Sequence, residues 1–220
     1  MEKNNHLKAV LLDLDGTLVD SLPEIYHIYC KFLAKYGHMG SKEEFDSLNG
    51  PSLKEVIEKL KHTYKIPDPL EDLIEYYTFK TMEVYQDLPL FPGVRDFLSF
   101  SKENGLLLAV VTAAPRMAAE FFLTRHKVDH FFVTLISGDE VEKAKPDPAI
   151  YQKVLKRLNL LPANAVAIED SSKGVLSSLG AGISTIWISH GKEVKDLPKN
   201  RVNTICNWGE ARSYFEKILL

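Results

Sequence analysis

The sequence predicts an α/β protein: a Rossmann-like parallel-sheet core that is interrupted, after its first strand, by an all-helical insertion. The apolar run at residues 8–12 ends abruptly in acidic residues, which is typical of a buried parallel strand, and the next comparable run begins only at residue 106. From residue 94 onward, short apolar runs alternate with amphipathic helical patterns. Such alternation favours a parallel sheet with helices on both of its faces.

The long segment between the first two predicted strands consists of helical patterns with clear start signals. Three pairs of residues have the Ser-x-x-Glu spacing of a capping box, which marks a helix start: Ser21 and Glu24, Ser41 and Glu44, and Ser52 and Glu55. A fourth helix is expected after Asp68, with Pro69 in its first turn. We therefore assign residues 21–88 to a helical cap domain, and residues 1–20 and 89–220 to the α/β core.

The rest of the core alternates between helices and strands, as a parallel sheet requires. Gly105 separates the first of these helices from its strand, and Gly180 and Gly182 end the last one. Helices are expected over residues 94–104, 116–126, 148–158 and 173–180, and strands over residues 106–111, 132–136, 165–168, 185–188 and 203–206.

The composition excludes several classes of protein. The chain has 27 Lys and Arg and 30 Asp and Glu, which gives a formal net charge of −3. It therefore lacks the excess of basic residues that is typical of proteins that bind nucleic acid. Two cysteines in 220 residues exclude a disulfide framework, and no apolar run approaches the length of a membrane span. The N-terminal residues lack the pattern of a signal peptide. We therefore expect a cytoplasmic protein without nucleic-acid or membrane partners, and a monomer rather than a dimer.

Polar residues gather where the predicted strands end. Because ligands of open α/β sheets bind beyond the carboxyl ends of the strands, these distant residues can converge on one site. Two acidic clusters close together repel each other unless a cation lies between them, and oxygen ligands favour a hard ion such as Mg²⁺. A lysine and a threonine beside that ion suit a phosphate. The clusters are Asp13-Leu-Asp15-Gly-Thr17, Thr112, Lys145-Pro146 and Glu169-Asp170.

This ordered set resembles the haloacid dehalogenase-like superfamily of phosphotransferases. Its first motif, DxDG[TV], is present as DLDGTLVDS from Asp13 to Ser21, and the Thr or Ser of its second motif matches Thr112 in VVTAAP. Its third motif, a lysine usually followed by proline, matches Lys145 in KAKPDPAIY, and the acidic pair of its fourth matches Glu169-Asp170 in AIEDSSKG. The helical segment is similar to the small cap that follows the first motif in this family, so the resemblance spans the chain.

The resemblance implies the catalytic pair. Asp13 is expected to attack phosphorus and form an aspartyl-phosphate. Asp15 is expected to protonate the leaving alcohol and then to deprotonate the water that hydrolyses the intermediate. The spacing suits these roles, because residues two apart in an extended chain point the same way.

The resemblance also implies the ligands of the metal and of the phosphate. Mg²⁺ is expected to be held by the Asp13 carboxylate, the Asp15 backbone carbonyl and Asp170, while Glu169 either joins the metal shell or orients Lys145. The phosphate is expected to be bound by Thr112, Ala113 and Lys145, with Gly16 shaping the turn that lets the backbone approach it.

Asp15 argues against dehalogenation, because dehalogenases of this superfamily lack the acid/base residue two positions after the nucleophile. The closest competing activity is that of a phosphosugar mutase of the β-phosphoglucomutase type, which has the same core and cap. Such mutases carry a His after the first motif and an Arg in a cap loop, where this chain has Ile25 and Leu53. A binding protein on the same fold is the third alternative, and the retention of Asp13 and Asp15 argues against it.

The favoured interpretation is therefore a Mg²⁺-dependent phosphatase. Its expected substrate is a small phosphorylated metabolite, of the sugar phosphate or phosphoglycolate type, and the expected reaction passes through an aspartyl-phosphate.

Overall fold

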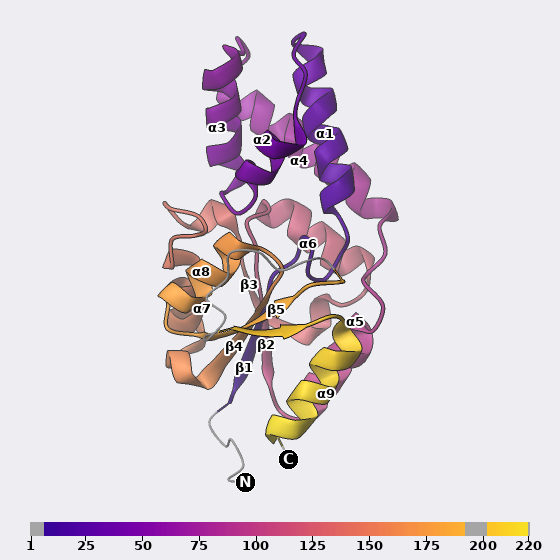
Figure 1. The fold of residues 1–220 in the computed structure, drawn as a ribbon, viewed down its shortest axis with the longest axis vertical. Coiled ribbons are helices and arrows are strands. Elements are labelled where there is room, and N and C mark those ends of the chain that lie inside the picture. Colours follow the sequence, from indigo (N-terminus) through magenta and orange to yellow (C-terminus); the bar gives the residue numbers. More distant parts are fainter. Residues whose placement is uncertain (1–6, 192–201, 220) are drawn as a thin grey trace.

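A single parallel sheet organises the core. The computed structural model describes residues 7–191 and 202–219. The expectation that the chain lacks a signal peptide rests on residues 1–6, which lie outside the described residues. The sheet has six strands in the order β3-β2-β1-β4-β5-β6, which is the Rossmann order (Figure 1). This confirms the predicted fold class. The strands are β1 (Ala9–Leu12), β2 (Leu107–Val111), β3 (Phe132–Ile136), β4 (Ala165–Glu169), β5 (Ser184–Ile188) and β6 (Val202–Ile205).

Helices cover both faces of the sheet, because the side chains of each strand alternate between two apolar clusters. In β1, Val10 and Leu12 pack in one cluster, with residues of α5 (Val94–Glu103), α6 (Arg116–Arg125) and α9 (Trp208–Leu219). Ala9 and Leu11 pack in the other, with α7 (Ala149–Leu158), and α8 (Ser172–Gly180) lies beside α7 (Figure 1). The described part of the core also contains three short 3₁₀ helices: η1 (Asp129–Phe131), η2 (Gly138–Glu140) and η3 (Pro162–Asn164).

The segment between β1 and β2 begins with four helices that stand above the sheet, at the carboxyl ends of its strands (Figure 1). They are α1 (Leu22–Lys35), α2 (Lys42–Leu48), α3 (Leu53–Tyr64) and α4 (Leu70–Asp87), and we call them the helical cap. The cap has its own apolar cluster, in which Phe32 of α1, Ile57 of α3 and Tyr77 of α4 are buried. The division of the chain into a cap domain at 21–88 and a core stays a proposal.

Two local predictions differ from the structure. Helix α9 was not predicted, although Trp208, Ala211 and Phe215 are fully buried at helical spacing. Among the three expected capping boxes, only that of Ser52 and Glu55 is complete. Ser41 accepts a bond from the Glu44 N–H, whereas Ser21 makes no capping bond at all.

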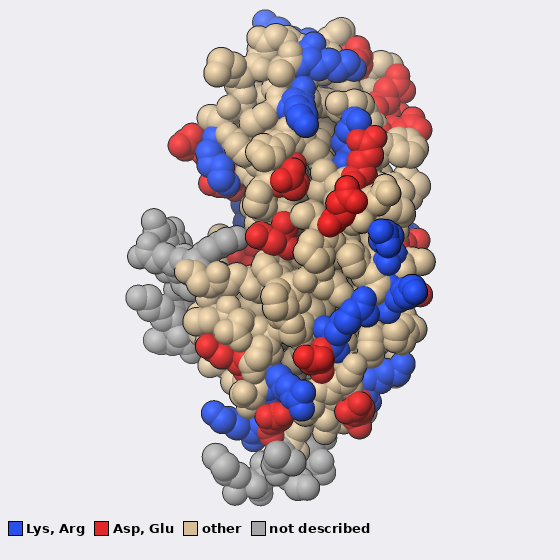
Figure 2. Space-filling model, turned by 90° about the vertical axis from the view of Figure 1, so that its right-hand side faces the viewer, with Lys and Arg blue, Asp and Glu red and all other residues tan. Residues whose placement is uncertain are grey.

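The surface carries charges of both signs. Figure 2 shows Lys and Arg side chains interspersed with Asp and Glu side chains over one face of the molecule. Among residues 7–191 and 202–219, no helix is both long enough and apolar enough to cross a membrane.

Candidate active site

Parallel pairing of the central strands brings the predicted acidic residues to one edge of the sheet. Strand β1 lies between β2 and β4, with Leu12 opposite both Val110 and Ile168. Asp13 follows β1, and its N–H donates to the Ile168 carbonyl at 3.1 Å. Glu169 ends β4 and Asp170 follows it. The site thus lies where the strand order reverses, the usual ligand position in such sheets.

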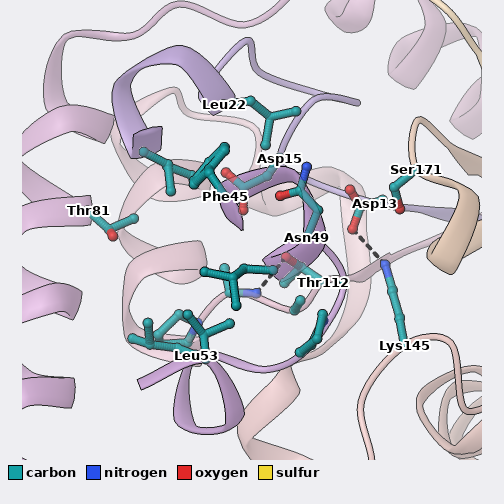
Figure 3. Close-up of a pocket in the computed structure, with 18 of the residues that line it drawn as sticks. Asp13, Asp15, Leu22, Phe45, Asn49, Leu53, Thr81, Thr112, Lys145 and Ser171 are labelled. Atoms are coloured by element: carbon teal, nitrogen blue, oxygen red, sulfur yellow. Dashed lines mark hydrogen bonds and ion pairs between the residues drawn. The ribbon is translucent and has the colours of Figure 1, made fainter. Parts of the chain in front are cut away.

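Lys145 is the buried centre of this site. Its Nζ lies 2.7 Å from Asp13 Oδ1 (Figure 3). It also lies 2.6 Å from Glu169 Oε1 and 3.0 Å from the Val111 carbonyl oxygen, so its three donors are all used within the protein. Burial alone would lower the pKa of Lys145, but the charges of Asp13 and Glu169 outweigh burial and raise that pKa. The hydroxyl of Tyr151 donates to the same oxygen, Glu169 Oε1, at 2.5 Å.

The carboxylates of Asp13, Glu169 and Asp170 fit a divalent cation. Oxygen atoms from the three side chains lie within 4.8 Å of one another. Lys145 offsets one of their formal charges, so two remain for a metal ion to offset. The Oε2 atom of Glu169 is buried and has no hydrogen-bond partner among the described residues. Such an oxygen-only set of donors suits Mg²⁺.

A glycine makes room for Asp170. Gly16 has a φ of +78°, and a Cβ at this position would lie 2.0 Å from Asp170 Oδ2. The neighbouring hydroxyl of Thr17 donates to Asp170 Oδ1 at 3.4 Å. Gly16 is therefore required both for the backbone conformation and for the close approach of this carboxylate.

Asp15 is held by two hydroxyl groups from the ends of the cap. Its Oδ1 accepts hydrogen bonds from Ser21 and Tyr85, each at 2.5 Å. Burial raises the pKa of Asp15 to about 6, although both hydrogen bonds act to lower it. The expected capping role of Ser21 is wrong for this reason: its buried hydroxyl binds Asp15 instead of the first turn of α1.

A pocket between the core and the helical cap opens onto these residues (Figure 3). Two of the predicted site residues do not line it: Glu169 is fully buried behind Lys145, and Gly16 lies against Asp170. The hydroxyl of Thr112 accepts a bond from the Ala114 N–H at 3.1 Å, which orients the loop after β2. The predicted residues that do line the pocket are Asp13, Asp15, Thr112, Ala113, Lys145 and Asp170.

Several residues at the site were not singled out in the sequence. Tyr85 and Tyr151 belong to ordinary apolar stripes of helices, and only the fold shows that their hydroxyls reach Asp15 and Glu169. Asn49 lines the pocket from the loop after α2, where the dipeptide Asn49-Gly50 is a recognisable turn signal. Ser171 also lines the pocket, and it caps α8 by accepting a bond from the Gly174 N–H at 3.1 Å.

Comparison with known proteins gives consistent results. A family model described as haloacid dehalogenase-like hydrolase matches residues 10–188. A phosphorylated carbohydrates phosphatase of Thermotoga maritima is 33% identical over 182 residues, which cover 82% of this chain and 84% of that protein. Phosphoglycolate phosphatase 1 of Pseudomonas aeruginosa is 30% identical over 190 residues, which cover 84% of this chain and 70% of that protein.

A solved structure of similar shape is that of a putative β-phosphoglucomutase from Thermotoga maritima. It has a TM-score of 0.73 and 29% sequence identity, and the match covers 97% of this chain and 100% of that one.

Proposed function

The chain belongs to the haloacid dehalogenase-like hydrolases, and on this premise we propose that it is a Mg²⁺-dependent phosphatase of small phosphorylated metabolites, of the sugar phosphate or phosphoglycolate type. The observation that carries the proposal is the position of Lys145 between Asp13 and Glu169, beside the cluster with Asp170, at the core side of the pocket. The names of the two similar phosphatases support the same class of substrate.

The residues supply the parts of a two-step phosphoryl transfer. In the first step, a carboxylate oxygen of Asp13 attacks phosphorus, the bond from phosphorus to the ester oxygen breaks, and Asp15 gives its proton to the leaving alcohol. In the second step, Asp15 takes a proton from water, whose oxygen attacks phosphorus and releases the Asp13 carboxylate. A pKa of about 6 allows Asp15 to do both near neutral pH.

The remaining groups hold the phosphate and its charge. Asp13, Asp170 and the backbone carbonyl of Asp15 are the proposed ligands of Mg²⁺, which when bound offsets the negative charge of the phosphoryl oxygens. Thr112 and Ala113 line the pocket beside Asp13 and bind phosphoryl oxygens. Lys145 adds positive charge and holds Asp13, and Glu169 holds Lys145.

Measurement of phosphate release from p-nitrophenyl phosphate tests this proposal. We expect release that needs Mg²⁺, stops with EDTA, and is lost in Asp13→Asn. The matched control is Asp129→Asn, which changes an exposed aspartate outside the pocket and leaves the rate unchanged. Equal rates with and without Mg²⁺, or an active Asp13→Asn protein, would overturn the mechanism.

A mutase is the second candidate, and the putative β-phosphoglucomutase among the similar structures favours it. Ile25 and Leu53, which stand where such mutases carry a His and an Arg, both line the pocket. Phosphorus NMR separates the two activities: a mutase converts one hexose phosphate into its isomer, whereas a phosphatase releases inorganic phosphate. We expect release. The cytoplasmic location and the monomeric state also stay proposals.

A further inference from the structure

The two sides of the pocket differ in chemistry. The core side carries the charged groups, whereas most of the side chains that the cap contributes are apolar. Figure 3 shows Phe45 and Leu53 on the side opposite Asp13 and Lys145. We call this surface the cap wall, and its apolar members are Leu22, Ile25, Phe45, Leu48, Leu53 and Val56.

The polar groups on the cap wall are neutral. The side chain of Asn49 makes no hydrogen bond among the described residues, so its donors and acceptor are available to a ligand. Thr81 donates its hydroxyl proton to the Tyr77 carbonyl at 2.9 Å, which leaves its oxygen as an acceptor. These groups suit the hydroxyls of a substrate, but none of them can offset a negative charge.

Lys145 is the one cation among the described residues that line the pocket, and its donors are already bound to the protein. Two further lysines line an adjoining hollow that shares Asn49 and three other residues with the pocket. There Lys173 donates to the Ser47 carbonyl at 2.6 Å, and Lys42 pairs with Asp46. Among the described residues, no cation lines the cap wall, so a second anionic group of a substrate has no positively charged side chain beside it there.

An anion that loses its water against an apolar wall, without a partner, is strongly disfavoured. We infer that this pocket selects monophosphate esters whose leaving group is uncharged and carries hydroxyls, and that it rejects a second anionic group such as a carboxylate or another phosphate. The inference rests on the proposed phosphatase activity and narrows it, because it favours neutral sugar or polyol phosphates over phosphoglycolate and bisphosphates.

A matched pair of substrates tests the inference. 2-Hydroxyethyl phosphate differs from 2-phosphoglycolate only in that it carries a hydroxymethyl group where 2-phosphoglycolate carries a carboxylate. We expect kcat/KM, measured by phosphate release with Mg²⁺, to be at least about tenfold higher for 2-hydroxyethyl phosphate. An equal or higher kcat/KM for 2-phosphoglycolate overturns the inference and leaves the proposed phosphatase intact. If the protein hydrolyses none of the three compounds, including p-nitrophenyl phosphate, the proposed function itself is overturned.

A cation placed on the cap wall tests the cause of the selectivity. Asn49→Lys should shift the ratio of the two kcat/KM values toward 2-phosphoglycolate by about tenfold, because the new ammonium group can pair with the carboxylate. Asn49→Gln, the matched control, keeps a neutral amide and should leave the ratio near that of the unchanged protein. The same ratio in all three proteins would show that missing positive charge is not the cause, and would overturn the inference.

Discussion

The hydroxyl of Tyr85 donates a hydrogen bond to Oδ1 of Asp15 at 2.5 Å, and so joins the last turn of α4 to the loop after β1. Ser21, directly before α1, donates to the same oxygen at 2.5 Å. Residues at both connections of the cap thus bind one carboxylate oxygen of the proposed acid. We therefore expect the orientation of Asp15 to depend on the position of the cap.

Removal of the Tyr85 hydroxyl should slow the reaction most when the leaving group needs a proton. Tyr85→Phe is expected to lower kcat/KM for 2-hydroxyethyl phosphate by about tenfold. This loss is smaller than the loss of the general acid itself would cause, because Asp15 remains in the variant. For p-nitrophenyl phosphate, whose leaving group needs no proton, we expect a change of less than about threefold. Tyr214→Phe, outside the pocket, is the control. Equal losses on both substrates would contradict this role.

A methyl group at Gly16 should weaken metal binding. Gly16 and Gly105 have φ values of +78° and +76°, so alanine strains both backbones by about 1–2 kcal/mol. A Cβ at Gly16 would overlap the Asp170 carboxylate, whereas a Cβ at Gly105 would have no neighbouring atom within 4 Å. We expect both variants to lower the melting temperature, but only Gly16→Ala to raise the Mg²⁺ concentration for half-maximal activity. Identical Mg²⁺ dependence would be evidence against Asp170 as a ligand.

Loss of the buried cation should destabilise the fold through its unpaired neighbours. Lys145→Met leaves Asp13 and Glu169 buried without their partner, which costs about 3–5 kcal/mol in comparable sites. The double variant Lys145→Met/Glu169→Gln removes one of these charges and should regain part of that stability. Urea unfolding with EDTA measures both. A double variant no more stable than Lys145→Met would contradict this explanation.

Glu140 should make stability depend on pH. Burial alone would raise the pKa of its carboxyl group, but hydrogen bonds from Arg116 and the Ser137 N–H outweigh burial and hold that pKa below the usual value. Because the pKa is lower in the folded protein, the stabilisation is present above the unfolded value of about 4.5 and is lost as pH falls through the folded value.

Glu140→Gln should therefore lower the free energy of unfolding by about 1–2 kcal/mol at pH 7, and by less as the pH falls below about 4.5. Urea unfolding at pH 7 and pH 3.5 tests this. The control is Glu216→Gln, whose exposed pair with Arg212 should contribute little at either pH. The prediction is contradicted if Glu140→Gln lowers the free energy of unfolding by the same amount at both pH values.

The fold class followed from patterns that are local in the chain. The strand before Asp13 and the alternation after residue 94 depend on the spacing of neighbouring side chains, so both can be recognised in the sequence. Helix α9 shows the limit of this reasoning. Its spacing is helical, but Trp208 is fully buried only because α5 and the sheet surround it.

The sequence by itself determined the fold class and named the polar residues after the strands, because strand-end motifs are contiguous and parallel pairing must bring them together. Only the tertiary structure decided what surrounds them. Tyr85 reaches Asp15 from 70 residues away, and Lys145 reaches Asp13 from 132 residues away. The apolar cap wall likewise exists only where separate helices meet. Such contacts depend on how helices pack in space, which the local spacing of residues does not specify.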